Sequence, residues 1–125
     1  MANRNFNRKQ ALEKEVKDIY FKVSFGATGA PTLSASDSLG VASIERDAQG
    51  TYTVTLDDKY HGGIKFFDGV LLDAAAEDIY FQLKADSVAS SKEVEFFCNT
   101  GATATDPSDG SVALFKLELK NNTIR

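Results

Sequence analysis

The chain has few of the residues that cross-link proteins or hold metals: among its 125 residues there are one cysteine, one histidine and two prolines, and no tryptophan. A lone Cys98 cannot form an internal disulfide, and with a single histidine it cannot supply the usual zinc ligand sets. Because Cys98 ends the run Glu95-Phe96-Phe97-Cys98, we expect a small buried strand residue and not a reactive thiol. The sequence therefore predicts a fold without disulfides, metals or cofactors.

Long apolar segments are also missing. No apolar run approaches the ~20 residues of a membrane-spanning helix, and the N-terminus lacks the apolar stretch and cleavage site of a secretory signal peptide. We therefore expect synthesis in a reducing cytoplasm and no membrane partner. The length of 125 residues predicts one domain.

Charge is unevenly distributed along the chain. The first 17 residues have a net charge of +3, and the remaining residues have a net charge of −7. We expect residues 1–15 to form an extended basic arm and residues 16–125 to form the folded domain, because the first segment is too polar to fold alone. The acidic domain argues against a nucleic-acid partner. The arm residues that we expect to bind an acidic protein partner are Arg4, Phe6, Arg8, Lys9 and Leu12.

From residue 16 onward, apolar and polar side chains alternate with a period of two, which is typical of half-buried strands. Turn residues separate the alternating runs at intervals of roughly 8–12 residues. The pattern predicts an all-β, single antiparallel β-sandwich, jelly-roll-like, with about seven or eight strands. It also predicts a hairpin over 41–56, a turn at Asp68-Gly69 and a helical turn over 73–77.

No motif in the sequence indicates catalysis. Asp57 and Asp58 precede His61, but no nucleophile stands near them in any known catalytic pattern. Loop 105–110 holds two carboxylates without EF-hand spacing, so we expect a solvated turn there. We expect a protein that is not an enzyme and has no catalytic residues.

Adjacent phenylalanines on a strand must point to opposite sides of a sheet. One ring of Phe66-Phe67 and one of Phe96-Phe97 should therefore leave the core or lie under a loop. With two tyrosines at outward positions, they predict an exposed aromatic contact surface. The residues that we assign to it are Tyr20, Phe67, Tyr80 and Phe97.

Taken together, the chain resembles the capsid decoration, or cement, proteins of tailed bacteriophages. The resemblance is carried by segments 3–8 (NRNFNR), 29–33 (GAPTL), 40–44 (GVASI), 50–56 (GTYTVTL, with Tyr60 after it), 78–83 (DIYFQL), 110–114 (GSVAL) and 119–121 (LKN). It implies a virion protein on the outside of the capsid that binds the major capsid protein through an extended arm. It also implies a homo-oligomer, either a dimer or a trimer.

The sequence thus favours a structural protein that bridges capsid subunits, with the arm and an edge of the sandwich buried against the shell. Two alternatives remain open. A phage tail, neck or fibre-associated protein would have a similar composition but would occur at one vertex. A carbohydrate-binding β-sandwich would stack sugars on Tyr20, Tyr60 or Tyr80, and clustering of tyrosines and carboxylates in one concave site would favour it.

Overall fold

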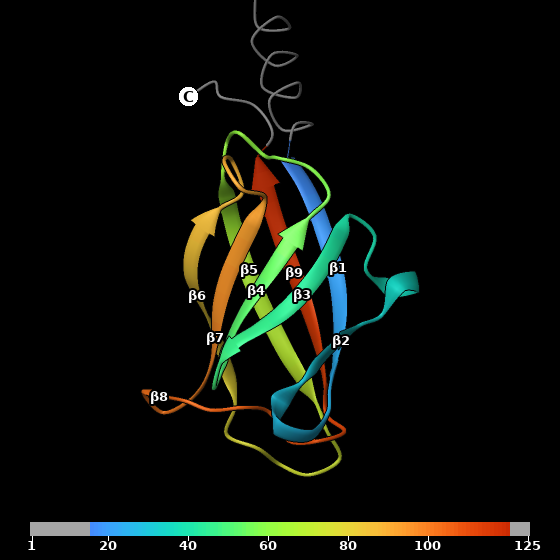
Figure 1. The fold of residues 1–125 in the computed structure, drawn as a ribbon, viewed down its shortest axis with the longest axis vertical. Helices are drawn as coiled ribbons and strands as arrows, with labels where there is room; N and C mark the ends of the chain where they lie inside the picture. The colour runs from blue at the N-terminus through green and yellow to red at the C-terminus, as the bar shows by residue number, and fades with distance from the viewer. Residues whose placement is uncertain (1–15, 121–125) are drawn as a thin grey trace, which may run out of the picture.

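A computed structural model describes residues 16–120. The described chain forms two antiparallel sheets packed face to face, which confirms the predicted β-sandwich (Figure 1). The arm assigned to residues 1–15 lies outside the described residues. The strands are β1 (Val16–Phe25), β2 (Pro31–Leu33), β3 (Val41–Ala48), β4 (Thr51–Leu56), β5 (Ile64–Leu72), β6 (Tyr80–Ser87), β7 (Glu93–Thr100), β8 (Thr103–Ala104) and β9 (Val112–Lys120). Two short 3₁₀ turns, η1 (Ala27–Gly29) and η2 (Ala35–Asp37), flank β2.

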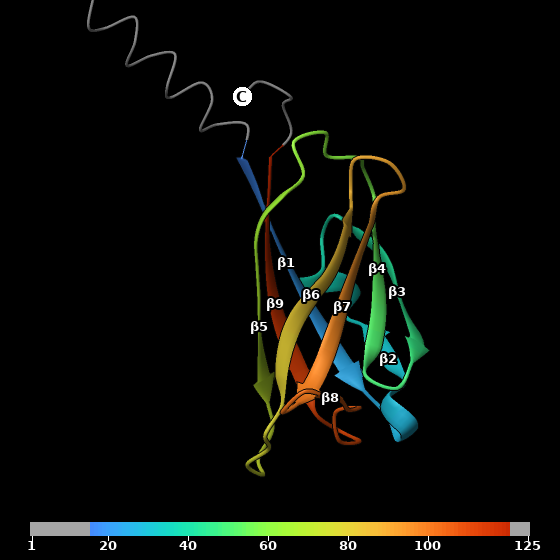
Figure 2. The same ribbon diagram turned by 90° about the vertical axis from the view of Figure 1, so that its left-hand side faces the viewer.

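The strand order is β2-β1-β9-β5 in one sheet, called sheet A here, and β3-β4-β7-β6 in the other, called sheet B, where β8 pairs with β7. Figure 2 shows the two sheets as separate layers. The β3–β4 hairpin confirms the hairpin expected over 41–56. The β1–β9 pair joins the two ends of the described chain, since Val16 lies opposite Lys120.

The core lies between the sheets and is built from the inward positions of each strand. Phe115 of β9 is its central aromatic residue. Its ring centroid lies 4.8–5.6 Å from four others, those of Phe21, Phe67, Phe81 and Phe96. Each fully buried side chain of this size contributes roughly 1.5–3 kcal/mol of transfer free energy. Cys98 is fully buried, as expected, and burial raises the pKa of its thiol to about 12.

Two local predictions were wrong. The expected turn at Asp68-Gly69 is the middle of β5, which runs without interruption from Ile64 to Leu72. Packing leaves no space for a side chain at Gly69, because a Cβ atom there would lie 2.7 Å from ring atoms of Phe115 and 2.8 Å from Phe81. Segment 73–77 forms bends and no helical turn.

Loop 105–110 also differs from its expected form. Asp106 is partly buried and accepts hydrogen bonds from Nε of Arg46 at 3.0 Å and from its terminal NH₂ at 2.8 Å, in a bidentate ion pair. The backbone N–H of Gly50 donates to the same carboxylate at 2.8 Å. Burial raises the pKa of Asp106, but the hydrogen bonds from Arg46 and Gly50 outweigh it and leave the pKa below its usual value. Asp106 is therefore fastened to the β3–β4 hairpin, whereas Ser108, Asp109 and Gly110 are exposed and Asp109-Gly110 forms the expected solvated turn.

Candidate docking surface

Large exposed apolar side chains gather on one side of the sandwich. Within residues 16–120, seven such side chains are exposed, and five of them point outward from sheet A. A sixth, Leu39, adjoins the same surface in the turn after η2, where it shares a depression with Tyr20. We call this surface the sheet A face, defined by Tyr20, Leu39, Phe66, Val70, Leu72 and Leu114.

Strand register places the apolar side chains of this face next to one another. Leu114 of β9 lies opposite Val70 of β5, and one step along the strands Lys116 lies opposite both Tyr20 of β1 and Asp68 of β5. Directly opposite side chains on one sheet face are ≈ 4.5–5.5 Å apart at their Cβ atoms. On β9 and β5, Leu114, Val70 and Leu72 form an apolar strip, whereas Lys22 lies opposite Leu114 on β1 and Glu118 lies opposite both Asp18 and Phe66.

Tyr20 lines several depressions on the sheet A face. One depression of about 390 Å³ is lined by Tyr20, Phe66, Asp68, Val70, Leu114, Phe115 and Lys116. Another, of about 280 Å³, is lined by Asp18, Tyr20, Ser36, Asp37 and Leu39. A third, of about 350 Å³, is lined by Tyr20, Phe21, Lys22, Asp37, Leu114 and Phe115. Each depression is large enough to receive one or two side chains, so the face can accept anchoring groups from a second surface.

The charges on the sheet A face are mixed, because Lys22 and Lys116 lie among its carboxylates. Asp18, Asp37 and Asp68 are exposed, and none of them forms an ion pair with another described residue. Lys116 is paired with Glu118 at 3.4 Å, and its pKa is raised by the hydrogen bond to that carboxylate. The face thus combines an apolar strip with both carboxylates and lysines: Lys22 and Asp37 line one depression together, and Asp68 and Lys116 line another.

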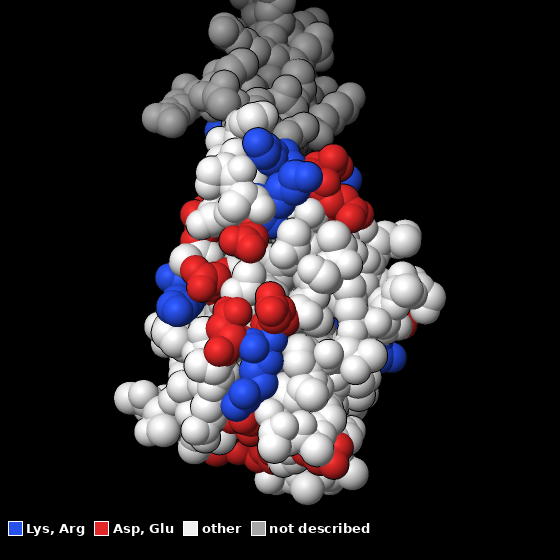
Figure 3. Space-filling model, in the orientation of Figure 1, with Lys and Arg blue, Asp and Glu red and all other residues white. Residues whose placement is uncertain are grey.

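The outward side of sheet B has a different composition. Figure 3 views this side and shows acidic and basic side chains next to one another. Threonines occupy the outward positions of β4, and Glu93 and Glu95 occupy those of β7. Phe97 also points outward but is half-buried, with Nζ of Lys84 5.5 Å from its ring centroid. The outer surface of sheet B is thus more polar than the sheet A face.

The predicted aromatic surface is not one surface. Tyr20 and Tyr80 are exposed, as expected, but they lie on different sheets. Phe67 was assigned to the wrong side, because the alternation of β5 turns its ring into the core against Phe96 and leaves Phe66 exposed. Sequence alternation alone could not decide between these two rings, since either register of β5 buries one of them.

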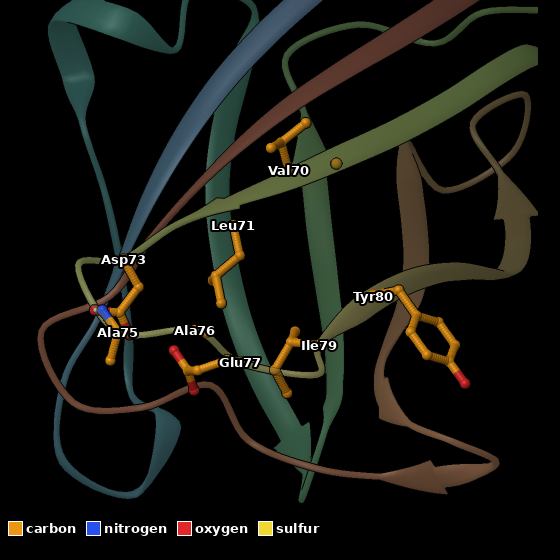
Figure 4. A pocket seen from close by; sticks show the side chains of 9 residues that line it. Val70, Leu71, Asp73, Ala75, Ala76, Glu77, Ile79 and Tyr80 are labelled. Carbon is orange, nitrogen blue, oxygen red and sulfur yellow. Dashed lines mark hydrogen bonds between the residues drawn. The ribbon is translucent and has the colours of Figure 1, made fainter.

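A further cavity, of about 370 Å³, lies between β5, the start of β6 and the connection 73–79. Figure 4 shows Tyr80 pointing away from the other residues that line it. The Ser108 hydroxyl donates a hydrogen bond to Glu77, and a hydrogen bond with the Glu77 carboxyl lowers the pKa of Asp73. The contact between Ser108 and Glu77 joins loop 105–110 to the connection 73–79 at one end of the sandwich.

The outer strands of both sheets are poorly suited to pairing with another chain. β2 has only three residues and begins at a proline. Each longer edge strand contains extra residues relative to its partner: Ala42 and Asp47 in β3, Lys65 in β5 and Lys84 in β6. Such bulges, short strands and charges are the devices by which proteins block edge-to-edge association. They argue against burial of the β3, β5 or β6 edge, but β2 pairs with β1 only from Val23 to Phe25, so residues 16–21 of β1 have no neighbouring strand on that side among the described residues.

The remaining candidate groups do not assemble into a catalytic or metal site. Asp57, Asp58 and His61 are all exposed in the β4–β5 connection, whereas Tyr60 is buried and cannot stack on a sugar. In the described part of the chain, no group of three or more His, Cys, Asp or Glu side chains could hold a metal ion. None of the helical segments between residues 16 and 120 is long and apolar enough to span a membrane.

Comparisons with protein-family models, with curated proteins and with solved structures found no match to this chain.

Proposed function

We propose that this chain is a structural protein that binds the outside of a phage capsid and stabilises it by bridging major capsid protein subunits. The observation that carries the binding role is the contrast between an apolar sheet A face and a hydrated sheet B surface. A contiguous exposed apolar surface usually marks a site of protein contact. The sequence resemblance to decoration proteins supplies the class of partner.

In this proposal the sheet A face lies against the shell and the sheet B surface faces solvent. The arm provides a second attachment, with Arg4, Arg8 and Lys9 beside acidic coat residues and Phe6 and Leu12 in apolar pockets. Two linked attachments bind more tightly than either alone, because the second is effectively intramolecular. A homo-oligomer on the shell would multiply the effect. The protein performs no reaction in this role.

Co-sedimentation with mature shells that lack the protein tests the proposal. We expect saturable binding of hundreds of copies per particle, spread over the whole shell. A few copies per particle would instead support the tail, neck or fibre alternative, in which the protein occupies one vertex. No binding to any phage particle would contradict a virion role.

A carbohydrate-binding role is the second candidate, and one observation favours it. The depression beside Tyr20 brings an exposed tyrosine together with Phe66 and the carboxylate of Asp68. Aromatic rings with nearby carboxylates suit the apolar and hydroxyl faces of a sugar. A glycan array would identify a ligand, and Tyr20→Thr should then abolish its binding; absence of any glycan signal would remove this candidate.

A further inference from the structure

The outer edge of β1 is covered over only part of its length. β1 pairs with β9 from Val16 to Ser24, but on its other side β2 pairs only with residues 23–25. Residues 16–21 therefore have no neighbouring strand on that side within residues 16–120. The pairing of β1 with β9 is also regular, without the bulges that interrupt β3, β5 and β6. A regular, open edge of this kind can pair with another strand.

The backbone groups of Asp18 and Tyr20 point to this open side. Lys22 faces it, because its carbonyl accepts a hydrogen bond from the N–H of Ser34 at 2.9 Å and its N–H donates to Oγ of Ser38 at 3.1 Å. Alternate residues of a strand direct their backbone groups to the same side, so Asp18 and Tyr20 face the same way as Lys22. No group within residues 16–120 bonds to their N–H or C=O on that side. The edge thus offers donors and acceptors to a further strand.

A depression of about 280 Å³ lies beside this open segment. It is lined by Asp18 and Tyr20 of β1 and by Ser36, Asp37 and Leu39 of the segment that follows β2. Figure 1 shows η2, which contains Ser36 and Asp37, on the side of β1 away from β9. The depression is therefore on the side to which the free backbone groups point, and it can receive one large side chain of a pairing strand.

The charges around the depression leave one carboxylate without an ion pair. Asp37 shares a neighbouring depression with Lys22, and Lys116 is paired with Glu118 at 3.4 Å. Asp18 forms no ion pair with another described residue and lies opposite Glu118 on β9. The side chain that best complements the depression is therefore a basic one.

A second copy of this chain fits the edge less well. Lys22 is already bonded to Ser34, so a second β1 could pair only with the residues before it. A register that pairs Tyr20 with Asp18 of the second copy would bring Val16 of that copy opposite Lys22, into the place that Ser34 occupies. A shift by two residues sets Asp18 opposite Asp18, and like charges directly opposite each other are destabilising. The edge therefore suits a different chain.

We propose that an extended segment of a coat subunit pairs with residues 16–21 of β1 and adds a strand to sheet A, with one arginine or lysine side chain in the depression. This inference rests on the proposed function and names the edge at which the coat binds. Main-chain hydrogen bonds to Asp18 and Tyr20 supply affinity, and the depression selects the side chain. The stem of the basic side chain lies against Tyr20 and Leu39, with its charge beside Asp18.

Amide hydrogen exchange on the full chain without shells tests whether the edge is open, independently of the capsid role. We expect the amides of Asp18 and Tyr20 to exchange at least about tenfold faster than those of Ile19 and Phe21, which face β9. Slow exchange at Asp18 and Tyr20 in the free protein would show that the edge is already occupied, and the proposal would be wrong.

Co-sedimentation with mature shells that lack the protein then compares two substitutions of Asp18. Asp18→Pro removes an N–H that β9 does not use, and proline is tolerated at such edge positions, so it should lower shell affinity by about tenfold or more while Ile19 and Phe21 keep their slow exchange. Asp18→Asn keeps the N–H and removes the charge, and should lower affinity by about fivefold. Unchanged binding of Asp18→Pro would rule out strand pairing, and unchanged binding of Asp18→Asn would rule out the basic side chain.

Asp78 provides a matched control, because it precedes Ile-Tyr-Phe as Asp18 does and is also exposed, but it lies just before β6. Asp78→Asn should leave shell binding unchanged, and a loss equal to that of Asp18→Asn would mean that only net charge matters and would contradict the assigned site.

Wild-type protein bound to shells provides a readout that does not depend on how the variants fold. We expect exchange at Asp18 and Tyr20 to slow at least about tenfold on binding, because both amides gain partners. Bound protein in which both amides still exchange fast would overturn edge pairing and leave the capsid role intact. Wild-type protein that does not bind shells would instead contradict the proposed function, and the coat partner with it.

Discussion

The two outward sheet surfaces of this sandwich are built on the same backbone pattern but differ in chemistry. Sheet B buries its inward residues and fills its outward positions with threonines, glutamates and a phenylalanine under a lysine. Sheet A buries an equally apolar inner face and yet exposes Tyr20, Phe66, Val70, Leu72 and Leu114. Sheet B shows that this fold tolerates polar side chains on its outer surface. The exposed apolar side chains of sheet A are therefore not required for the domain to fold.

The largest expected effect is a difference in stability between substitutions on the inward and outward sides of one strand. On β9, Phe115 points into the aromatic core and its neighbour Leu114 points outward. Phe115→Ala should lower the free energy of unfolding by about 3–5 kcal/mol, because it removes the central ring and leaves a cavity. Leu114→Thr, which introduces a β-branched residue that suits a strand, should lower it by less than about 1 kcal/mol.

Urea denaturation of the two β9 variants measures this difference. If Leu114→Thr destabilised the protein as strongly as Phe115→Ala, the outward apolar strip would be part of the folding core. The contrast between the two sheets would then have no functional meaning.

A second prediction concerns which ion pairs contribute to the stability of the fold. The exposed pairs Lys84–Glu95 on sheet B and Lys116–Glu118 on sheet A are 3.7 Å and 3.4 Å apart and should contribute little, as exposed ion pairs generally do. Asp106 instead accepts three hydrogen bonds from Arg46 and Gly50 in a partly buried position. Asp106→Asn should cost about 2–3 kcal/mol at pH 7, the range for hydrogen bonds to charged groups.

The pH dependence of this effect follows from the lowered pKa of Asp106. A carboxyl with a lowered folded pKa stabilises fully above its unfolded pKa of about 3.9, and this stabilisation is lost as pH falls through the folded value. The difference between wild type and Asp106→Asn should therefore be constant from pH 5 to 8 and shrink below about pH 4. Urea titrations across this range check it, and a difference that grew toward low pH would contradict the assigned role.

The sequence predicted the sandwich well because period-two alternation is a local signal. The inward residues of β4 and β9, such as Tyr52 and Leu117, could be assigned from their neighbours alone, and all are buried. The alternation failed where two adjacent positions were both apolar, as at Phe66-Phe67. It also could not identify Gly69 as a packing residue, because its partners Phe81 and Phe115 are distant in the sequence.

The candidate surface was only partly predictable, for a related reason. Tyr20 could be recognised as outward from its strand, but the side chains that join it on the sheet A face come from β5 and β9. Their adjacency depends on strand order, which short-range patterns do not contain. Asp106 was likewise interpreted as a turn residue because its partner Arg46 is 60 positions away.

The smallest expected effect compares the two exposed tyrosines as shell-binding residues. Tyr20→Thr removes a ring that lines three depressions of the sheet A face, and Tyr80→Thr removes a ring of similar exposure from sheet B. Both substitutions suit a strand and should change stability by no more than about 0.5 kcal/mol. Tyr20→Thr should weaken shell binding by about tenfold, or about 1.4 kcal/mol, and Tyr80→Thr should leave it unchanged. Saturation curves from co-sedimentation give both affinities, and equal losses for the two tyrosines would mean that shell binding does not distinguish the two sheets.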